Sequence, residues 1–437
     1  MNSTVTDEHG VTTRVVQDVD EFERLKPEWD ILLEESGLSP FQSFEYLRAW
    51  WRHFGESNRN ARLHIVLTSR GRETLGIAPL FLERAGACRL CRFRRLAFLG
   101  RETSDYLDLL IRRGEERVCV ENLARHLAES SSLFDVIMLE DLSDRSAVTD
   151  LLYERLTREH FHGVRFVNEQ CPRTRLFDTW EHTLASLKTD TRREIRRRER
   201  NLNKHFSVQT EIVEGGENLM GDVDDFIAMH QERWTNAGHE GVFADRRVAA
   251  LHREIAGPFS RRGWLFLAFL SVDGKRAVAQ YGYTFRSELL IFLGGASTLP
   301  ALHRYSPGKV LTGYCMQEAV RRGLTVYDFM RGTERYKYDF DGVDVPNWTM
   351  RLYSGPSRGT EHKIRFDDLL RPLQRRGRRE RLLWGQARAQ HALVSVHTAR
   401  HIVVRLWRNI ADGLGKLSGP AMGAGQDDHR KGGYGGE

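Results

Sequence analysis

The stretch Ser306-Pro307-Gly308-Lys309 combines residue types that suit the binding of an anion. Serine is a favoured N-cap and proline a favoured first helical residue, so the sequence predicts a helix that begins here. In that first turn Gly308 costs about 1 kcal/mol relative to alanine, and Lys309 adds a cation where the helix dipole is already positive. A phosphate would offset both costs, because it accepts free N–H groups, approaches the backbone at glycine and is neutralised by lysine. We therefore predict that Ser306, Gly308, Lys309 and Val310 form a phosphate site.

The alternative is an ordinary loop between a strand and a helix, with Lys309 in solvent. The spacing around Lys309 differs from the P-loop pattern GxxxxGK[ST], which disfavours nucleotide hydrolysis. The phosphate interpretation therefore depends on first-turn N–H groups and an ammonium that are free to bind a ligand.

A polar segment that begins at Arg331 holds a second set of reactive groups. Arg331, Glu334, Tyr336 and Lys337 supply two cations, a carboxylate and a phenol just beyond a predicted strand, Thr325 to Met330. Groups of these types can exchange protons with a ligand and hold its charges. The alternative is a solvated polar loop with aromatic side chains packed beneath it.

A basic helical region lies between Lys188 and Lys204, with eight basic residues against three acids. Ile195 and Leu202 are its only large apolar residues, so the predicted helix has a thin buried stripe and a solvated face by default. The functional alternatives are the phosphates of a ligand, an anionic membrane surface, or RNA, for which charge is the only indication.

The elements that position these residues are predicted to form two copies of one α/β unit. A hairpin starting at His64 is matched by one at Trp264, and Phe98-Leu99-Gly100 recurs as Phe292-Leu293-Gly294. Each copy continues with a loop, a helix and an apolar strand. The first copy has Arg-Arg-Gly-Glu-Glu (112–116) where the second has its glycine-lysine turn, and its two acids would repel a phosphate. We therefore expect one site per chain.

Length and composition are those of a globular protein with tails. The 437 residues, 40% of them hydrophobic, allow two or three domains with large cores, and the net charge is +6. No secretion signal or membrane-spanning run is evident, and five cysteines favour reduced thiols in the cytosol. Cys88 and Cys91 form a C-x2-C pair that lacks the further ligands of a zinc site, so no metal is predicted.

Six stretches together resemble the GNAT-fold acyltransferases of the family that includes CelD-type cellulose-biosynthesis proteins, relatives of the Fem aminoacyl (peptidyl) transferases. They are Phe41-Gln42-Ser43 through Trp50-Trp51 to Phe54-Gly55; Gly76-Ile77-Ala78-Pro79-Leu80; Ser104-Asp105-Tyr106-Leu107-Asp108; His230 through Arg233-Trp234 to Gly241 and Phe243; Ser306 to Lys309; and Asp328-Phe329 through Arg331-Gly332 to Tyr336-Lys337-Tyr338. The resemblance runs from about Val15 to Tyr353. It implies an acyl-CoA or acetyl-CoA donor and N-acyl transfer, with an acceptor that varies within the family.

The polar residues after Arg331 have the types that transfer from a thioester to an amine requires. Such a reaction needs a deprotonated amine and an acid for the departing thiolate. We assign Glu334 as the base or an anchor for the acceptor amine, Tyr336 as the thiolate acid, and Arg331 with Lys337 as holders of the donor or of an acidic acceptor. Asp328 lies within a strand, and we expect it to make a structural hydrogen bond or ion pair.

His230, Arg233 and Trp234 share one helical face, because they lie at i, i+3 and i+4. The resemblance implies that this face forms the wall of the acceptor site. A tryptophan at that spacing is usually part of the core, so a core position is expected for Trp234 and a site position for Arg233.

The expected architecture is α/β, with tandem GNAT-like domains of mixed sheets flanked by helices. Residues 11–170 form the first domain, 171–356 the second domain with the donor site, 361–410 a basic segment with an amphipathic helix, and 411–437 a disordered tail. The C-terminal helix is expected either to contact anionic lipid or to pack on the domains or a partner helix.

The expected function is that of a cytoplasmic N-acyltransferase, either free or at the inner face of the membrane. Its acceptor would be an amino sugar or nucleotide sugar of envelope polysaccharide synthesis, or the amine of a lipid precursor, and no nucleic acid is expected. The alternative is a non-catalytic scaffold of an envelope-polysaccharide complex whose donor site has degenerated.

Overall fold

The computed structural model describes residues 5–6, 10–86, 91–144, 146–297, 300–355 and 359–364. Residues 1–368 form one compact unit. Apart from residues 361–364, the predicted basic segment, amphipathic helix and tail lie outside the described residues, as does Cys88.

The first half of the compact unit begins with strands and short helices and ends in a long strand. Its elements are β1 (Val5–Thr6), β2 (Val11–Val16), α1 (Val19–Arg24), α2 (Lys26–Ser36), α3 (Phe44–Trp50), β3 (Ala61–Leu63), β4 (Ile65–Arg70), β5 (Glu73–Ala78), β6 (Leu80–Ala85), β7 (Phe93–Phe98), β8 (Leu110–Ile111), α4 (Glu116–Glu129), β9 (Val136–Ser143), α5 (Ala147–Arg158) and β10 (His162–Arg175). The helical stretch from Val19 to Ser36 is divided at Leu25, because Pro27 starts the second helix.

The second half repeats the alternation of helices and strands. Its elements are α6 (Trp180–Ser186), α7 (Thr189–His205), β11 (Val208–Val213), α8 (Leu219–Asn236), α9 (Arg246–Arg261), β12 (Leu265–Val272), β13 (Lys275–Phe285), β14 (Glu288–Ala296), α10 (Pro307–Arg321), β15 (Val326–Asp328), α11 (Arg335–Tyr338) and β16 (Val343–Tyr353). Sequence analysis did not predict β11 or α11, which are short or weakly patterned.

The two halves share one strand arrangement. In the second half β11, β12, β13 and β14 pair antiparallel in order, and β14 then pairs parallel with β15. In the first half β2, β4 and β5 pair antiparallel, β6 continues from β5 beyond Pro79 to pair with β7, and β7 pairs parallel with β9. The predicted duplication is therefore confirmed, and each half contributes one parallel pair among antiparallel pairs, as expected for a mixed sheet.

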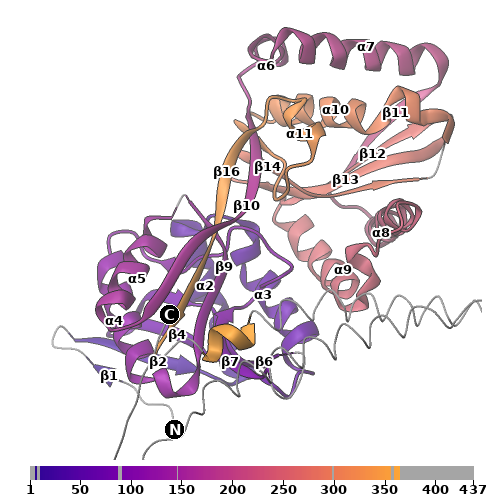
Figure 1. Ribbon diagram of the computed structural model, residues 1–437. Helices are drawn as coiled ribbons and strands as arrows, with labels where there is room; N and C mark the ends of the chain where they lie inside the picture. The colour runs from indigo at the N-terminus through magenta and orange to yellow at the C-terminus, as the bar shows by residue number, and fades with distance from the viewer. Residues whose placement is uncertain are drawn as a thin grey trace, which may run out of the picture. The chain divides into compact units, whose positions relative to one another are not determined.

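Two long strands join the halves. β10 pairs antiparallel with β15 of the second half and, over most of its length, with β16 (Figure 1). β16 in turn pairs with β9 of the first half, so each half receives a strand from the other. The result is a continuous sheet in the order β11-β12-β13-β14-β15-β10-β16-β9-β7-β6-β3.

Helices cover both faces of the second-half sheet (Figure 1). α8 and α9 lie on one face, and α10 lies on the other with α7 across it (Figure 1). Ile195 and Leu202 are the buried residues of α7, which confirms the thin stripe predicted for the basic helix. No helix among the described residues is long and apolar enough to cross a membrane.

β14 and β15 separate soon after they meet. Their parallel pairing covers Glu288 to Leu290 only, while β14 continues to Ala296 along its other neighbour, β13. The edge of β14 beyond Leu290 is therefore released from β15, and α10 begins after the loop that follows it.

Asp328 at the end of β15 is fully buried and bonded to Arg173 Nε and Tyr106 Oη, both at 2.8 Å, which confirms its structural role.

Candidate functional site

The start of α10 leaves one backbone donor available to a ligand. Ser306 adopts a left-handed conformation, φ 52°, and its carbonyl accepts the N–H groups of Lys309 and Val310 at 3.0 and 3.3 Å. Pro307 has no N–H, so Gly308 supplies the one first-turn donor without a partner among the described residues. A Cβ at Gly308 would meet no atom within 4 Å, which leaves open space above this donor.

The helix begins where the sequence predicts, with Ser306 at the N-cap position, but the Ser306 side chain makes no hydrogen bond to the first turn. The left-handed backbone turns the hydroxyl away from the first-turn N–H groups, and Arg198 of α7 donates a hydrogen bond to it instead. Arg198 is itself held by Glu194 of the same helix, with Nε and Oε1 2.5 Å apart. The basic helix thus places a guanidinium at the start of α10.

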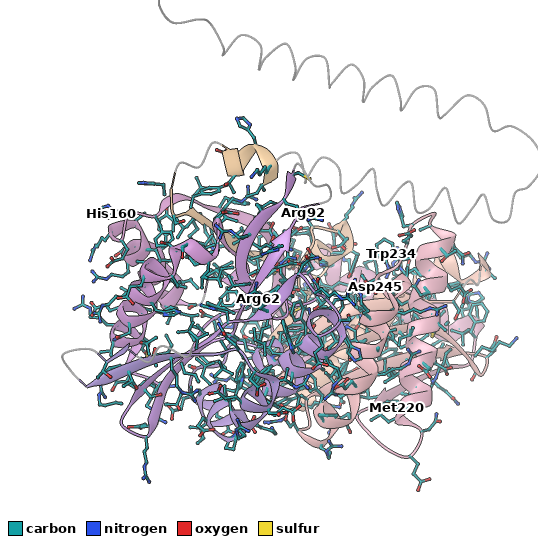
Figure 2. The ribbon with its side chains drawn as sticks, turned by 90° about the horizontal axis from the view of Figure 1, so that it is seen from below. Arg62, Arg92, His160, Met220, Trp234 and Asp245 are labelled. Atoms are coloured by element: carbon teal, nitrogen blue, oxygen red, sulfur yellow. The ribbon has the colours of Figure 1, made fainter. Side chains whose placement is uncertain are left out.

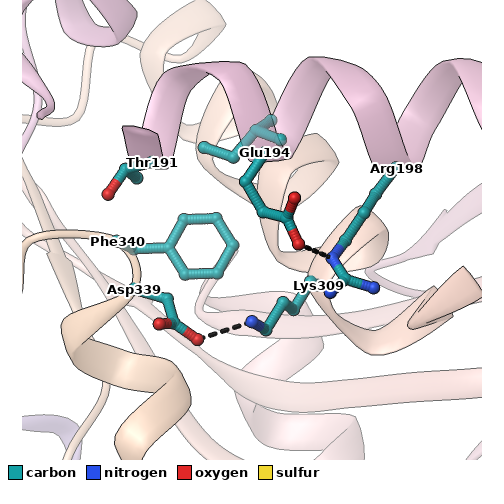
Figure 3. A pocket seen from close by; sticks show the side chains of 7 residues that line it. Thr191, Glu194, Arg198, Lys309, Asp339 and Phe340 are labelled. Carbon is teal, nitrogen blue, oxygen red and sulfur yellow. Dashed lines mark hydrogen bonds and ion pairs between the residues drawn. The ribbon is translucent and has the colours of Figure 1, made fainter. Parts of the chain in front are cut away.

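Lys309 does not supply the unpaired ammonium that the sequence analysis expected. Its Nζ lies 2.5 Å from Asp339 Oδ2, in an ion pair between the first turn of α10 and the residue after α11 (Figure 3). Together with Glu194 and Arg198, the pair lines a cavity of about 10 Å³ (Figure 3). A cavity of this size holds about one water, so a phosphate would have to bind outside it, over Gly308.

Val310 contributes to the core rather than to this surface. Its side chain is buried, and its N–H is bonded to Ser306. Its part in a phosphate site is therefore limited to the helix that it helps to hold in place.

The short helix α11 carries the predicted acid–base residues. Glu334 precedes it, is more than half exposed, and pairs with Lys337 Nζ at 2.9 Å. Burial raises the pKa of Tyr336 to about 12; the negative charge of Glu334 also raises it and the nearby Arg233 lowers it. These influences place Glu334, Tyr336 and Arg233 within electrostatic range of one another.

Lys337 and Arg331 have internal partners. Lys337 is buried, and its ammonium donates to the carbonyls of Met330, Arg331 and Gly332 at 3.0, 2.6 and 3.1 Å. Arg331 Nε donates to Asp105 Oδ1 of the first half at 2.5 Å. Lys337 therefore holds the loop after β15, and Arg331 joins the two halves. Because the Lys337 ammonium is fully used by these carbonyls and by Glu334, it has no N–H group left to hold the acyl donor.

His230 and Arg233 converge on the released edge of β14. The Gly294 carbonyl accepts from His230 Nδ1 at 2.9 Å and from Arg233 at 3.4 Å. Burial lowers the pKa of His230 to about 4, so at neutral pH the ring is uncharged, with its proton on Nδ1 and a lone pair on the buried Nε2. Trp234 is half-buried near the end of α8 (Figure 2), a partial match to its predicted core position.

Comparison with known proteins identifies the fold of the second half. Residues 189–338 match the family model of an acetyltransferase (GNAT) domain. The second half has the GNAT fold. The matched range includes strand β14, helix α10 and strand β15, which carry Gly294, Gly308 and Asp328.

Among solved structures, that of FemX agrees at the level of fold. The structure of FemX is 10% identical with a TM-score of 0.53, over 74% of this chain and 95% of that chain. The C-terminal domain of a putative lysylphosphatidylglycerol synthetase from Agrobacterium fabrum is 11% identical with a TM-score of 0.47, over 81% and 97%. A tandem GNAT protein of the clavulanic acid pathway is 11% identical with a TM-score of 0.40, over 79% and 99%. No curated protein sequence matches the chain.

Sequence reasoning missed two residues that shape this candidate site. Arg198 was one of many arginines in a basic run, although its i,i+4 spacing from Glu194 predicts the pair between them. Asp339 was the last residue of the polar segment, and no sequence signal links it to Lys309.

Among the described residues no group of three or more His, Cys, Asp or Glu side chains could hold a metal ion.

Proposed function

We propose that the protein is an N-acyltransferase that moves an acyl group from acyl-CoA or acetyl-CoA to an amine. The observation that carries the proposal is the position of α11, which connects two parts of the site. Asp339 at its end pairs with Lys309 at the start of α10, and the pKa of Tyr336, one turn earlier, responds to the charges of Glu334 and Arg233. The donor's phosphates would lie over Gly308 and its thioester beside the released edge of β14.

The residues around α11 can support the proton transfers of the reaction. The amine nitrogen attacks the thioester carbon, a C–N bond forms, the C–S bond breaks, and CoA leaves as a thiolate. Tyr336 retains its proton at neutral pH, since its pKa is raised, and is proposed to donate it to that thiolate. Glu334 is proposed to take the proton that the amine loses or to hold the amine beforehand.

The residues that hold the acceptor are proposed to be those on the α8 face, His230, Arg233 and Trp234. His230 and Arg233 already contact the Gly294 carbonyl, so an acceptor in front of them would lie next to the thioester. We propose an amino sugar, a nucleotide sugar or the amine of a lipid precursor as the acceptor, within envelope polysaccharide or lipid synthesis. The CelD-type resemblance of the six sequence stretches supports the polysaccharide branch.

Thermal unfolding with free CoA, acetyl-CoA and a long-chain acyl-CoA tests the donor. A ligand at 100 times its dissociation constant adds about 2.7 kcal/mol to the free energy of unfolding. We expect a rise in Tm with at least one thioester, and CoA thiol release when an amine acceptor is added. The absence of a shift with all three compounds would refute an acyl-CoA donor.

One observation favours the second candidate, a scaffold with a degenerate donor site. Both cations near the start of α10 already have acidic partners, Arg198 with Glu194 and Lys309 with Asp339. A phosphate must therefore either share these cations with the two carboxylates or displace the carboxylates, and both weaken phosphate binding. A full-length protein that binds no thioester would support the scaffold.

A further inference from the structure

A polar cluster joins the two halves beside β9, β16 and the loop after β15. It consists of the buried residues Asp105, Asp141 and Asn347 and of the partly exposed Arg331. Asp105 Oδ1 receives Arg331 Nε at 2.5 Å and Asn347 Nδ2 at 3.4 Å. Asp141 Oδ2 lies 3.4 Å from an Arg331 nitrogen, and Asp141 Oδ1 receives Asn168 Nδ2 at 3.4 Å. The cluster therefore contains two carboxyl groups and one guanidinium.

Two acceptor atoms of this cluster have no protein partner among the described residues. They are Asp105 Oδ2 and Asn347 Oδ1, and both side chains are 0% exposed. Leaving a buried acceptor unpaired costs about 1–3 kcal/mol. Both atoms are acceptors, so the missing partner must be a hydrogen-bond donor. The nearby donors of Arg331 and Asn347 are already bonded to Asp105 Oδ1.

Charge and backbone geometry also set the cluster apart. Burial raises the pKa of Asp141 to about 7; the charges of Asp105 and Glu140 also raise it, whereas those of Arg331 and Arg101 lower it. A carboxylate there would be stabilised by an additional cation. Tyr106, Asp141 and Met330 are non-glycine residues with φ of 57°, 60° and 57°, a strained arrangement that is common at functional sites.

We propose that this cluster binds the primary ammonium group of the acyl acceptor, which leaves Glu334 the role of base and not that of anchor for the amine. An ammonium group supplies both features that the cluster lacks, hydrogen-bond donors for Asp105 Oδ2 and Asn347 Oδ1 and a positive charge for the second carboxyl group. The Arg331 side chain is 34% exposed while the other three side chains are buried, so a ligand would have to approach the cluster beside Arg331. This inference rests on the proposed function, in which the acceptor is an amine.

The inference changes the expectation for Arg331. Sequence analysis assigned it to the donor or an acidic acceptor, but its guanidinium is committed to Asp105 in a cluster with an excess of carboxyl groups. The acceptor that suits this cluster is cationic. Amino sugars and lipid amines share that chemistry, and the test distinguishes them.

Binding of matched amines and alcohols to the full-length protein tests the proposal. D-glucosamine is compared with D-glucose, and ethanolamine with ethylene glycol, by thermal unfolding titration. We expect one amine to raise Tm and its neutral counterpart to have no effect; glucosamine would indicate an amino sugar and ethanolamine a lipid amine. Equal effects of amine and alcohol would overturn the proposal and leave a structural water as the occupant.

Two variants test the cluster, and a third is a matched control. Asp141→Asn keeps the shape of the side chain, whose contacts to Arg331 and Asn168 are both 3.4 Å long, and removes its charge. Asn347→Leu removes the unpaired Oδ1. Each variant should weaken amine binding about tenfold or more. Asp108→Asn alters an equally buried aspartate, also with a pKa raised to about 7, that lies outside the cluster, and should leave amine binding unchanged.

Titration of every variant with CoA separates this proposal from the proposed function. CoA binding should be the same in the wild type, Asp141→Asn and Asn347→Leu. Amine binding that survives in both folded variants would overturn the ammonium site even if CoA binds. A protein that binds the amine through the cluster but no thioester would refute the acyltransferase and retain the site.

Discussion

Lys309 at the start of α10 and Asp339 after α11 form an ion pair with Nζ and Oδ2 2.5 Å apart. The pair links the proposed phosphate position to the helix that carries Tyr336. A phosphate that attracts the Lys309 ammonium would therefore act on the end of α11. Donor binding and the position of the proposed acid are connected through these two residues.

Changes to this ion pair should shift CoA affinity in opposite directions. Lys309→Met removes the cation near the phosphate and should weaken CoA binding about tenfold, which corresponds to about 1.4 kcal/mol. Asp339→Asn removes the competing carboxylate and should tighten binding. Calorimetric titration with free CoA measures both, and weaker binding in Asp339→Asn would contradict the competition.

Replacement of Tyr336 should affect turnover more than binding. Tyr336→Phe removes the proposed acid and should lower kcat by about 100-fold or more with little change in Tm, whereas Tyr338→Phe in the same helix serves as the control. CoA thiol release from acetyl-CoA with an amine acceptor measures this. An unchanged kcat would exclude Tyr336 as the acid.

The pH dependence of turnover also reports on Tyr336. An acid is active while protonated, below its pKa, and burial raises this pKa to about 12. The wild type should therefore show no loss of kcat from this group as pH rises from 7 to 10. A fall in kcat near pH 8 that disappears in Tyr336→Phe would show that Tyr336 titrates far lower than its burial implies.

Lys337 should be important for stability. Lys337→Met leaves the carbonyls of Met330, Arg331 and Gly332 without their shared donor and should lower the free energy of unfolding by about 2–4 kcal/mol. Lys275→Met, at an exposed lysine, should change it by less than about 0.5 kcal/mol. Urea unfolding measures both, and equal effects would show that the three hydrogen bonds contribute little.

Stability should fall in mild acid because of buried histidines. Burial, with His126 alongside, lowers the pKa of His64 to about 4 from 6.5, so as pH falls below 6.5 the unfolded chain takes up a proton before the folded protein does. The free energy of unfolding should then fall by about 1.4 kcal/mol per pH unit for this group between pH 6.5 and 4, and stay level above pH 7. His64→Gln should reduce that slope by the same amount in urea titrations across the range.

Much of the fold was predictable because its signals are local. The Asp273-Gly274 turn between apolar strands predicts the hairpin of β12 and β13, and Pro307 predicts where α10 begins. The recurrence of Phe98-Leu99-Gly100 predicts two related halves. The exchange of β10 and β16 between halves was not predictable, because strand pairing across so great a separation leaves no local pattern.

The sequence by itself determined which chemical groups are available and which helix start could receive a phosphate. Its backbone preferences are set by adjacent residues, so Pro307, Gly308 and the polar run after β15 can be recognised without coordinates. Tertiary structure alone decided which charges are free. Whether Lys309 meets Asp339, or Arg331 meets Asp105, depends on packing between segments far apart in the chain, and that packing determines the net charge each ligand would encounter.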